Sequence, residues 1–390
     1  MRTPAAAPAA LRRAALLAAA CALAAAGCTS LRLERYLVPR PDDWPMFART
    51  VAHTAGAETL APPLAPAWTQ DVSAGTGNGS PVVMDSIVFV GTLRGELVAV
   101  SASTGKTIGA IALGDAIQGS PVIDGNVAFV ALSNSQLSLV ALELFTGRPR
   151  WKKPYGDVEV TPCIYRGRIY LGNTAGTFFC IERATGDERW KFTLPANTTL
   201  KGIRSSAAAD SGLVVFGAED GKIYALDAET GALRWSFDTG APVAASILIT
   251  GGKAIAGNMR GTLTALDLYR GLRAWQAETG APIYANAIPA GDLVVVGNLA
   301  GGMAAFRTTD GMRAWKADLE GPVNSGCVLA GSTLYVGTMK KFVYGLDPDN
   351  GAVTWKVEAG GRIRTSPAVA FGRLFITTDE HDLIAYREKQ

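Results

Sequence analysis

The stretch that decides the fold is Gly221-Lys-Ile-Tyr-Ala-Leu-Asp-Ala-Glu-Thr-Gly-Ala-Leu-Arg-Trp235. A short apolar strand ends on an aspartate, a Thr-Gly turn follows, and a tryptophan stands four residues after the glycine. The same spacing occurs six times, about every forty residues, and ends at Trp151, Trp190, Trp235, Trp275, Trp315 and Trp355. Alternating apolar side chains with glycine punctuation indicate a β-meander. A period in the low forties that contains only strands predicts a β-propeller with one four-stranded blade per repeat.

The repeat continues to both ends of the chain and sets the number of blades. Upstream of the six copies, Gly109 stands where a tryptophan is expected, and Trp68 precedes it at the same period, which gives eight outer strands. After Trp355 the chain supplies only three strands, whereas the segment around Trp68 is a fourth strand without a blade. We therefore predict an all-β fold: an eight-bladed β-propeller of four-stranded antiparallel blades, closed by an N-terminal strand that joins the C-terminal blade.

The residues of the repeat have structural roles. Asp227, Asp267 and Asp347 occupy the same position before the turn, where the carboxylate can cap backbone N–H groups. Gly231 can adopt the positive φ that a short hairpin needs. Each tryptophan offers a flat apolar surface to the adjacent blade and an N–H to a nearby carbonyl. We assign the tryptophans to the fold and not to a cofactor.

The first residues have the layout of a secretory signal: arginines, an alanine-rich run at 14–26, and then Cys28. The stretch Leu23-Ala-Ala-Ala-Gly-Cys28 resembles a bacterial lipobox, which implies that Cys28 is the acylated N-terminus of the mature chain. The alternative is ordinary signal cleavage within the alanine run, with Cys28 incidental. Thr29 stands where an aspartate would signal retention in the inner membrane, so the resemblance favours the outer membrane.

We expect three segments along the chain: a lipoprotein signal peptide at 1–27, a lipidated tether at 28–43 and the propeller at 44–390. A fully extended tether of this length spans on the order of 50 Å, enough to hold the propeller away from a bilayer. The stretch 44–56 resembles the lead-in before the first blade of many propellers with quinoprotein-type repeats, and we expect it to pack on a propeller face.

Composition excludes several classes of function. The net charge of +3 comes from three arginines of the signal, which leaves 34 basic and 34 acidic residues. This balance argues against nucleic-acid binding and against a polybasic membrane patch. No later stretch is long and apolar enough for a spanning helix. The repeat places Cys163, Cys180 and Cys327 too far apart to pair, so we expect buried free thiols.

The sequence offers no constellation for catalysis, for a cofactor or for a metal ion. The chain has only two histidines, His53 and His381. The acidic residues beside His381 occupy a turn between two strands, and the stretch 347–351 fills a standard turn without the rest of a calcium loop. No nucleophile elbow, phosphate-binding glycine loop or Cys-x-x-Cys motif stands in a supporting context. We therefore expect a protein that is not an enzyme and holds no cofactor.

One set of equivalent positions, two residues before each innermost strand, should reach the mouth of the central channel. Ala244 occupies one of these positions, and the others are polar: Asn78, Gln118, Glu159, Arg204, Tyr284, Asn324 and Arg364. The simpler interpretation is that a channel mouth is wet and carries polar residues. The functional alternative is a site for a small ligand or a peptide, with Arg204 and Arg364 as partners of an anion.

One interval between tryptophans is stretched to 45 residues, and its excess lies between Trp190 and Ser206. Long connections on a rigid ring are where recognition residues tend to lie. The pattern Gly-x-Leu/Ile-x-Ala-Leu-Asp-x-x-x-Gly-x-x-x-Trp, at 221–235 and 261–275, resembles the quinoprotein-type repeat. Across nearly the whole mature chain the resemblance is closest to the BamB family, eight-bladed lipoproteins of the outer-membrane β-barrel assembly machinery.

The resemblance implies a non-enzymatic scaffold at the periplasmic face of the outer membrane, with a monomeric propeller, which assists the assembly of outer-membrane proteins through contacts with the barrel subunit. In the family a Leu-Arg-Gly stretch of this connection contacts that subunit, which implies a partner contact at Leu200, Lys201 and Gly202. Lysine keeps the charge of arginine but lacks its planar fork. The acidic partner-binding residues of the family have no clear match at 240–246.

Two alternatives stay open. A propeller lipoprotein that binds another envelope protein or a glycan would share all these features. A quinone-dependent dehydrogenase resembles the chain in repeat and blade number, but such enzymes typically carry adjacent cysteines and an acidic calcium cluster, and this chain has neither. A shared fold does not transfer the activity.

Overall fold

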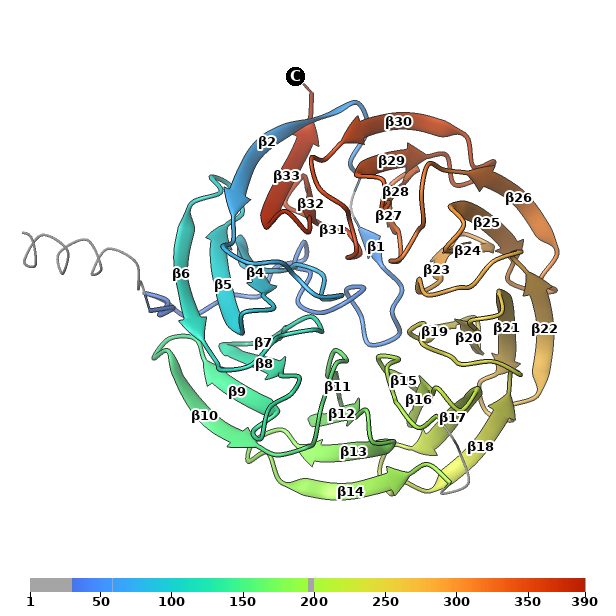
Figure 1. The fold of residues 1–390 in the computed structure, drawn as a ribbon, viewed down its shortest axis with the longest axis horizontal. Coiled ribbons are helices and arrows are strands. Elements are labelled where there is room, and N and C mark those ends of the chain that lie inside the picture. The colour runs from blue at the N-terminus through green and yellow to red at the C-terminus, as the bar shows by residue number, and fades with distance from the viewer. Residues whose placement is uncertain (1–29, 58, 196–199, 390) are drawn as a thin grey trace, which may run out of the picture.

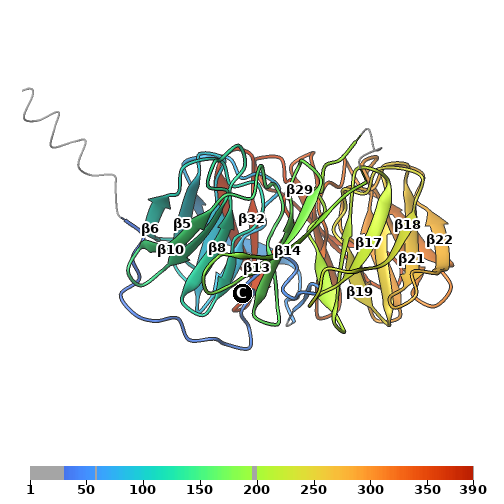
Figure 2. The ribbon, with the colours of Figure 1, turned by 90° about the horizontal axis from the view of Figure 1, so that it is seen from below.

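The computed structural model describes residues 30–57, 59–195 and 200–389, and none of these residues is helical. They form eight sheets arranged as a closed ring around a central channel (Figure 1), and the ring is a flat disc when seen from the side (Figure 2). The predicted all-β, eight-bladed propeller is therefore confirmed.

Each blade is an antiparallel meander that runs outward from the channel. Blades 1 to 4 comprise β3 (Val82–Met84), β4 (Ile87–Gly91), β5 (Glu96–Ser101) and β6 (Thr107–Ala112); β7 (Val122–Asp124), β8 (Val127–Ala131), β9 (Leu139–Glu143) and β10 (Arg148–Lys153); β11 (Cys163–Tyr165), β12 (Arg168–Gly172), β13 (Thr177–Glu182) and β14 (Glu188–Thr193); and β15 (Ala208–Asp210), β16 (Leu213–Gly217), β17 (Lys222–Asp227) and β18 (Leu233–Asp238).

Blades 5 to 8 repeat this plan. They comprise β19 (Leu248–Thr250), β20 (Lys253–Gly257), β21 (Thr262–Asp267) and β22 (Arg273–Glu278); β23 (Ile288–Ala290), β24 (Leu293–Gly297), β25 (Gly302–Arg307) and β26 (Arg313–Asp318); β27 (Val328–Ala330), β28 (Thr333–Gly337), β29 (Phe342–Leu346) and β30 (Val353–Glu358), with β1 (Gly56–Ala57) added; and β31 (Ala368–Ala370), β32 (Arg373–Thr377) and β33 (Asp382–Glu388), with β2 (Leu64–Asp71) as the outer strand.

The last blade closes the ring as predicted. Strand β2 pairs antiparallel with β33, with Leu64 opposite Glu388 and Trp68 opposite Ala385. The N-terminal strand therefore supplies the fourth strand that the C-terminal repeat lacks, and neither strand is left as an unpaired edge at this seam.

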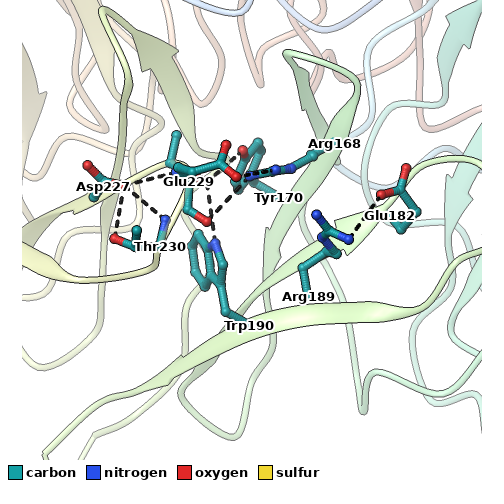
Figure 3. Close-up of polar contacts among 9 residues, drawn as sticks. Arg168, Tyr170, Glu182, Arg189, Trp190, Asp227, Glu229 and Thr230 are labelled. Carbon is teal, nitrogen blue, oxygen red and sulfur yellow. Dashed lines mark hydrogen bonds and ion pairs between the residues drawn. The ribbon is translucent and has the colours of Figure 1, made fainter.

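The tryptophans form the joints between blades, and Figure 3 shows the joint between blades 3 and 4. The indole N–H of Trp190 and the hydroxyl of Tyr170 both donate to the carbonyl of Ala228 in the next blade, at 3.3 and 2.9 Å. Gly231 has a φ of 74°, and a Cβ there would lie 2.6 Å from the Trp190 ring. The indole N–H groups make the equivalent bond at six positions: Trp68 to Ala102, Trp151 to Arg183, Trp190 to Ala228, Trp235 to Leu268, Trp275 to Thr308 and Trp315 to Pro348.

The aspartate before each turn acts as the predicted cap. One carboxylate oxygen of Asp227 accepts the backbone N–H groups of Glu229 and Thr230, at 3.0 and 2.9 Å. Its other oxygen accepts from Arg234, and this bond, with those from the backbone, lowers the pKa of Asp227 to about 2. Asp227 and Thr230 lie beside Trp190 in Figure 3, so cap and joint form one structural unit.

The missing tryptophan at Gly109 has a structural reason. The N-terminal segment enters this joint, with Leu31 fully buried and its N–H donating to the carbonyl of Ala110 at 2.9 Å. Leu33 is also buried and donates to the carbonyl of Leu144 in blade 2, at 2.9 Å. A Cβ at Gly109 would lie 2.9 Å from the Cα of Leu31, so only glycine leaves room for the segment. Leu31 thus takes the place of the absent indole.

The segment expected to be an extended tether lies against the propeller over its described part, 30–43. Leu37 is buried, and its N–H donates to the side chain of Asn126 at 2.6 Å. The carboxylate of Asp85, fully buried in a turn of blade 1, forms ion pairs with Arg35 and Arg40. Apolar burial and these ion pairs hold the segment on blades 1 and 2, so its reach is much shorter than that of an extended chain.

Residues 44–57, which we call the N-terminal plug, cross one end of the channel. The plug exchanges backbone hydrogen bonds with five innermost strands, through Val83, Ile123, Ala209, Ile249 and Leu329. Trp44 is buried in this layer, and β1 continues it as a parallel partner of β27. The lead-in therefore packs on a propeller face, as expected, and covers the channel at that end.

Candidate functional site

The channel opens into a cavity of about 70 Å³, enough for a few water molecules. Its lining comes from all eight blades and from the plug: Phe47, Asn78, Gly119, Glu159, Thr161, Arg204, Ser206, Ala244, Ser246, Tyr284, Asn286, Asn324, Ser325, Arg364 and Ser366. The lining residues precede the innermost strands or lie at their start, whereas the plug bonds to those strands further along. The cavity is thus a recess at the open end of the channel, with Phe47 of the plug in its lining.

The structure brings most of the predicted polar ring together around this recess. Six of its seven residues line the cavity, and the exception is Gln118, which lies against Gly77 of the neighbouring blade while Gly119 takes its place in the lining. Ala244 also lines the cavity. The period of the repeat therefore predicted the place of these side chains, and their function stays a prediction.

The two arginines of the ring have different surroundings. Arg204 forms ion pairs with Glu159 and with Glu219, the latter at 2.8 Å from Nε to Oε1. Arg204 is therefore already neutralised and is not the anion partner that the sequence suggested. Arg364 is exposed, and its guanidinium makes no hydrogen bond or ion pair with the part of the chain that the structure describes.

A second ring of hydroxyl groups lies just inside the first and was missed in the sequence. In each bond a backbone N–H donates to the hydroxyl of the next blade: Ser80 to Ser120 at 2.8 Å, Ser120 to Thr161 at 2.9 Å, Thr161 to Ser206 at 3.1 Å and Ser206 to Ser246 at 3.3 Å. Each bond joins one blade to the next. The signal was present as a Ser-Pro or Thr-Pro pair at the start of several repeats.

The long connection between β14 and β15 stands on the same face as the cavity. Leu200 is 52 % exposed and Lys201 is exposed, whereas Gly202 is buried. The N–H of Gly202 donates to the carboxylate of Glu219 at 3.1 Å, and its carbonyl accepts the N–H of Glu219 at 2.9 Å. The end of the connection is therefore fixed to blade 4, and residues 196–199 lie outside the described part.

The three thiols of the described part and the imidazole of His53 are buried. Cys163, Cys180 and Cys327 are free thiols, as predicted, and burial raises the pKa of Cys163 and Cys327 to about 12. Such thiols stay protonated and unreactive. In the plug, burial lowers the pKa of His53 to about 4, and its ring Nδ1–H donates to the carbonyl of Ile247 at 2.8 Å. His53 is therefore a neutral structural residue.

Two features are absent from residues 30–57, 59–195 and 200–389. No group of three or more His, Cys, Asp or Glu side chains there is arranged to hold a metal ion. None of these residues belongs to a helix that could cross a bilayer. Cys28, the predicted lipidation site, lies outside the described part.

The family of the chain follows from its repeats. A family model described as "Outer membrane protein assembly factor BamB" matches residues 65–130, 107–192, 181–317 and 300–390, which together cover every blade. The chain belongs to this family. The BamB protein of Legionella pneumophila is 28% identical over 167 residues, which are 40% of this chain and 42% of that relative. The chain thus spans less than half the length of this curated relative.

Solved structures place BamB within a larger group of propellers. The structure of BamB from Moraxella catarrhalis has a TM-score of 0.72 at 19% identity and covers 83% of this chain and 99% of that one. A quinohemoprotein alcohol dehydrogenase from Comamonas testosteroni has a TM-score of 0.73 at 14% identity and covers 90% and 82%. At these identities the likeness shows the fold alone, and BamB proteins share it with enzymes.

Proposed function

We propose that this chain is a lipid-anchored scaffold at the periplasmic face of the outer membrane, which assists the assembly and insertion of outer-membrane proteins through protein-protein contacts and not through catalysis. The observation that carries this proposal is the BamB family match over residues 65–390. It is a property of the blades as a whole and not of one turn or one joint. The name of the family supports the proposed process, and the exposed residues of the long connection support the proposed place of contact.

The partner contact is proposed at Leu200, Lys201 and Gly202. An exposed leucine beside a lysine offers both an apolar and a charged contact, and Glu219 fixes the end of the connection at Gly202. A contact held on a rigid ring loses little conformational freedom when it binds. The open face of the propeller supports this choice, because the N-terminal plug covers the channel on the other side.

Crosslinking in native envelopes tests the proposal. A photoreactive residue at position 200 is expected to capture a barrel-assembly subunit, whereas the same residue in place of Leu233, 48 % exposed on the outer strand β18, is expected to capture much less. The double substitution Leu200→Ala and Lys201→Ala should reduce recovery of the subunit about tenfold, which corresponds to about 1.4 kcal/mol. Recovery of only another envelope protein or a glycan would reject the proposed partner.

The anchor is tested separately. Cys28→Ser should move the protein from the membrane fraction to the periplasmic fraction, because the acyl chains attach to this sulfur. Cys163→Ser is the matched control, since that thiol is buried in blade 3. A Cys28→Ser protein that stays in the outer membrane would contradict lipid anchoring at this residue.

The dehydrogenases of the same fold suggest a second function, a quinone-dependent oxidation, but the residues present do not fit it. Pockets for molecules of drug size measure about 300–1,000 Å³, and the recess in this channel measures about 70 Å³. A stoichiometric chromophore after addition of pyrroloquinoline quinone and calcium would overturn this conclusion.

A further inference from the structure

The recess at the channel mouth has one side that is rich in hydrogen-bond donors. Blades 6 to 8 contribute Tyr284, Asn286, Asn324 and Arg364 to its lining, and none of these side chains carries a negative charge. The acidic residue of the lining, Glu159, comes from blade 3 and is paired with Arg204. One side of the recess therefore carries the ion pair of Glu159 and Arg204, and the other side carries Arg364 with neutral amide and phenol groups.

Asn286 is the residue that points to a ligand. Its side chain lines the recess, the residue is only 4 % exposed, and its amide Nδ2 has no hydrogen-bond partner. The hydroxyl of Ser366 donates to the Oδ1 of the same amide at 3.4 Å, which leaves Nδ2 as the free donor. Buried donors without a partner are rare in folded proteins because they lose their bonds to water. A bound acceptor would satisfy this group.

The charge of the recess selects the kind of acceptor. Arg364 is the one arginine of the lining that has no ion pair with the described residues, since Arg204 is held between Glu159 and Glu219. Although its charge helps to lower the pKa of Asp379, the Arg364 guanidinium forms no ion pair with the described residues and can match a single negative charge. Its planar fork can donate two parallel hydrogen bonds, an arrangement that fits a carboxylate.

We propose that the recess binds a carboxylate, with Arg364 and the Nδ2 of Asn286 donating to its oxygens. A volume of about 70 Å³ admits a carboxylate head, and the open mouth leaves room for the rest of the ligand to extend outward. Two sources have this chemistry: a free small carboxylate, or the C-terminal carboxylate of an extended polypeptide. The inference rests on the recess alone and not on the proposed scaffold function.

Calorimetric titration of the purified mature protein tests the site. The probes are sodium acetate, sodium phosphate and a short peptide with a free C-terminus, each measured against sodium chloride at equal ionic strength. We expect saturable binding of acetate. Arg364→Gln should weaken this binding at least tenfold, because a charge-assisted pair of bonds is lost. The matched control is Arg94→Gln, since Arg94 is an exposed arginine in a turn between β4 and β5, outside the lining.

The outcomes distinguish the two sources of the carboxylate and include the results that would overturn the proposal. A peptide acid that displaces acetate, while its C-terminal amide does not, identifies the chain terminus as the ligand; acetate binding without peptide binding identifies a small metabolite. No saturable binding of acetate overturns the proposal, as does tighter binding of phosphate or an equal loss in Arg364→Gln and Arg94→Gln. Asn286→Leu gives a second readout, with weaker acetate binding at an unchanged or raised melting temperature.

Discussion

Leu31 should hold the N-terminal segment on the propeller, and the variant Leu31→Ala measures the free energy that this side chain contributes to the contact. The side chain is fully buried in the joint between blades 1 and 2, where the other joints have an indole. The substitution removes three buried carbon groups at about 0.8 kcal/mol each, and the cavity that remains raises the cost to about 3 kcal/mol. Because the segment lies at the chain terminus, this loss should appear as local release and leave the ring folded.

Hydrogen exchange of the Leu31 and Leu33 amides reports this release, since both amides donate to carbonyls of the blades. We expect exchange about a hundredfold faster in Leu31→Ala, which is what about 3 kcal/mol gives. Ile108→Ala is the control, because Ile108 lies on the neighbouring strand β6 and is 38 % exposed. Unchanged exchange in Leu31→Ala, or an equal change in both variants, would refute the idea that Leu31 replaces the missing tryptophan.

Three further predictions concern the joints and the plug. Trp235→Phe loses a buried 2.8 Å hydrogen bond to the next blade and should cost about 1–3 kcal/mol in denaturant unfolding; Trp355→Phe, whose indole makes no such bond to the described residues, should cost less. Gly231→Ala should lower the melting temperature, because φ is 74° and the added Cβ would lie 2.6 Å from the indole of Trp190. Gly252→Ala is the control: φ is 68° there but no atom lies near an added Cβ, so this variant measures the backbone strain without the steric contact. For His53 the folded pKa of about 4 lies below the usual value of about 6.5, because burial disfavours the charged imidazole. The contribution of His53 to the free energy of unfolding is therefore complete above pH 6.5, and about 3 kcal/mol of it is lost as the pH falls to 4. The difference in unfolding free energy between wild type and His53→Gln over this range should show that slope, and a flat difference would reject it.

The sequence predicted the ring well because each blade repeats the same local events. A turn with Asp227 and Gly231, and a tryptophan that meets the next blade, recur at a fixed period, so one copy explains the others. The same period placed the polar ring at the channel mouth, since equivalent positions of a propeller lie at equal heights around the axis. Even the closing strand at Trp68 followed from counting strands.

The N-terminal segment could not be predicted in this way, because it occurs once. Gly109 showed only that an indole was missing, and no periodic pattern links it to Leu31, which lies 78 positions earlier in the chain. The neutralisation of Arg204 was equally hidden, since Glu219 comes from the turn between β16 and β17 of the same blade and not from the ring itself. Contacts between a unique segment and a repeat depend on three-dimensional shape, whereas the repeat itself depends on spacing.

The N-terminal segment also covers some surfaces of the disc and leaves one face open. Its first described part lies on the rim of blades 1 and 2, only two positions after Cys28, and its plug covers one end of the channel. An acyl chain on Cys28 would therefore hold that rim close to the bilayer, because little chain is left to extend. The face with the recess, Arg364 and Leu200 is the one that neither the rim segment nor the plug covers. The propeller can then contact a partner through its open face while its rim stays anchored at the membrane. A membrane-anchored scaffold requires this arrangement.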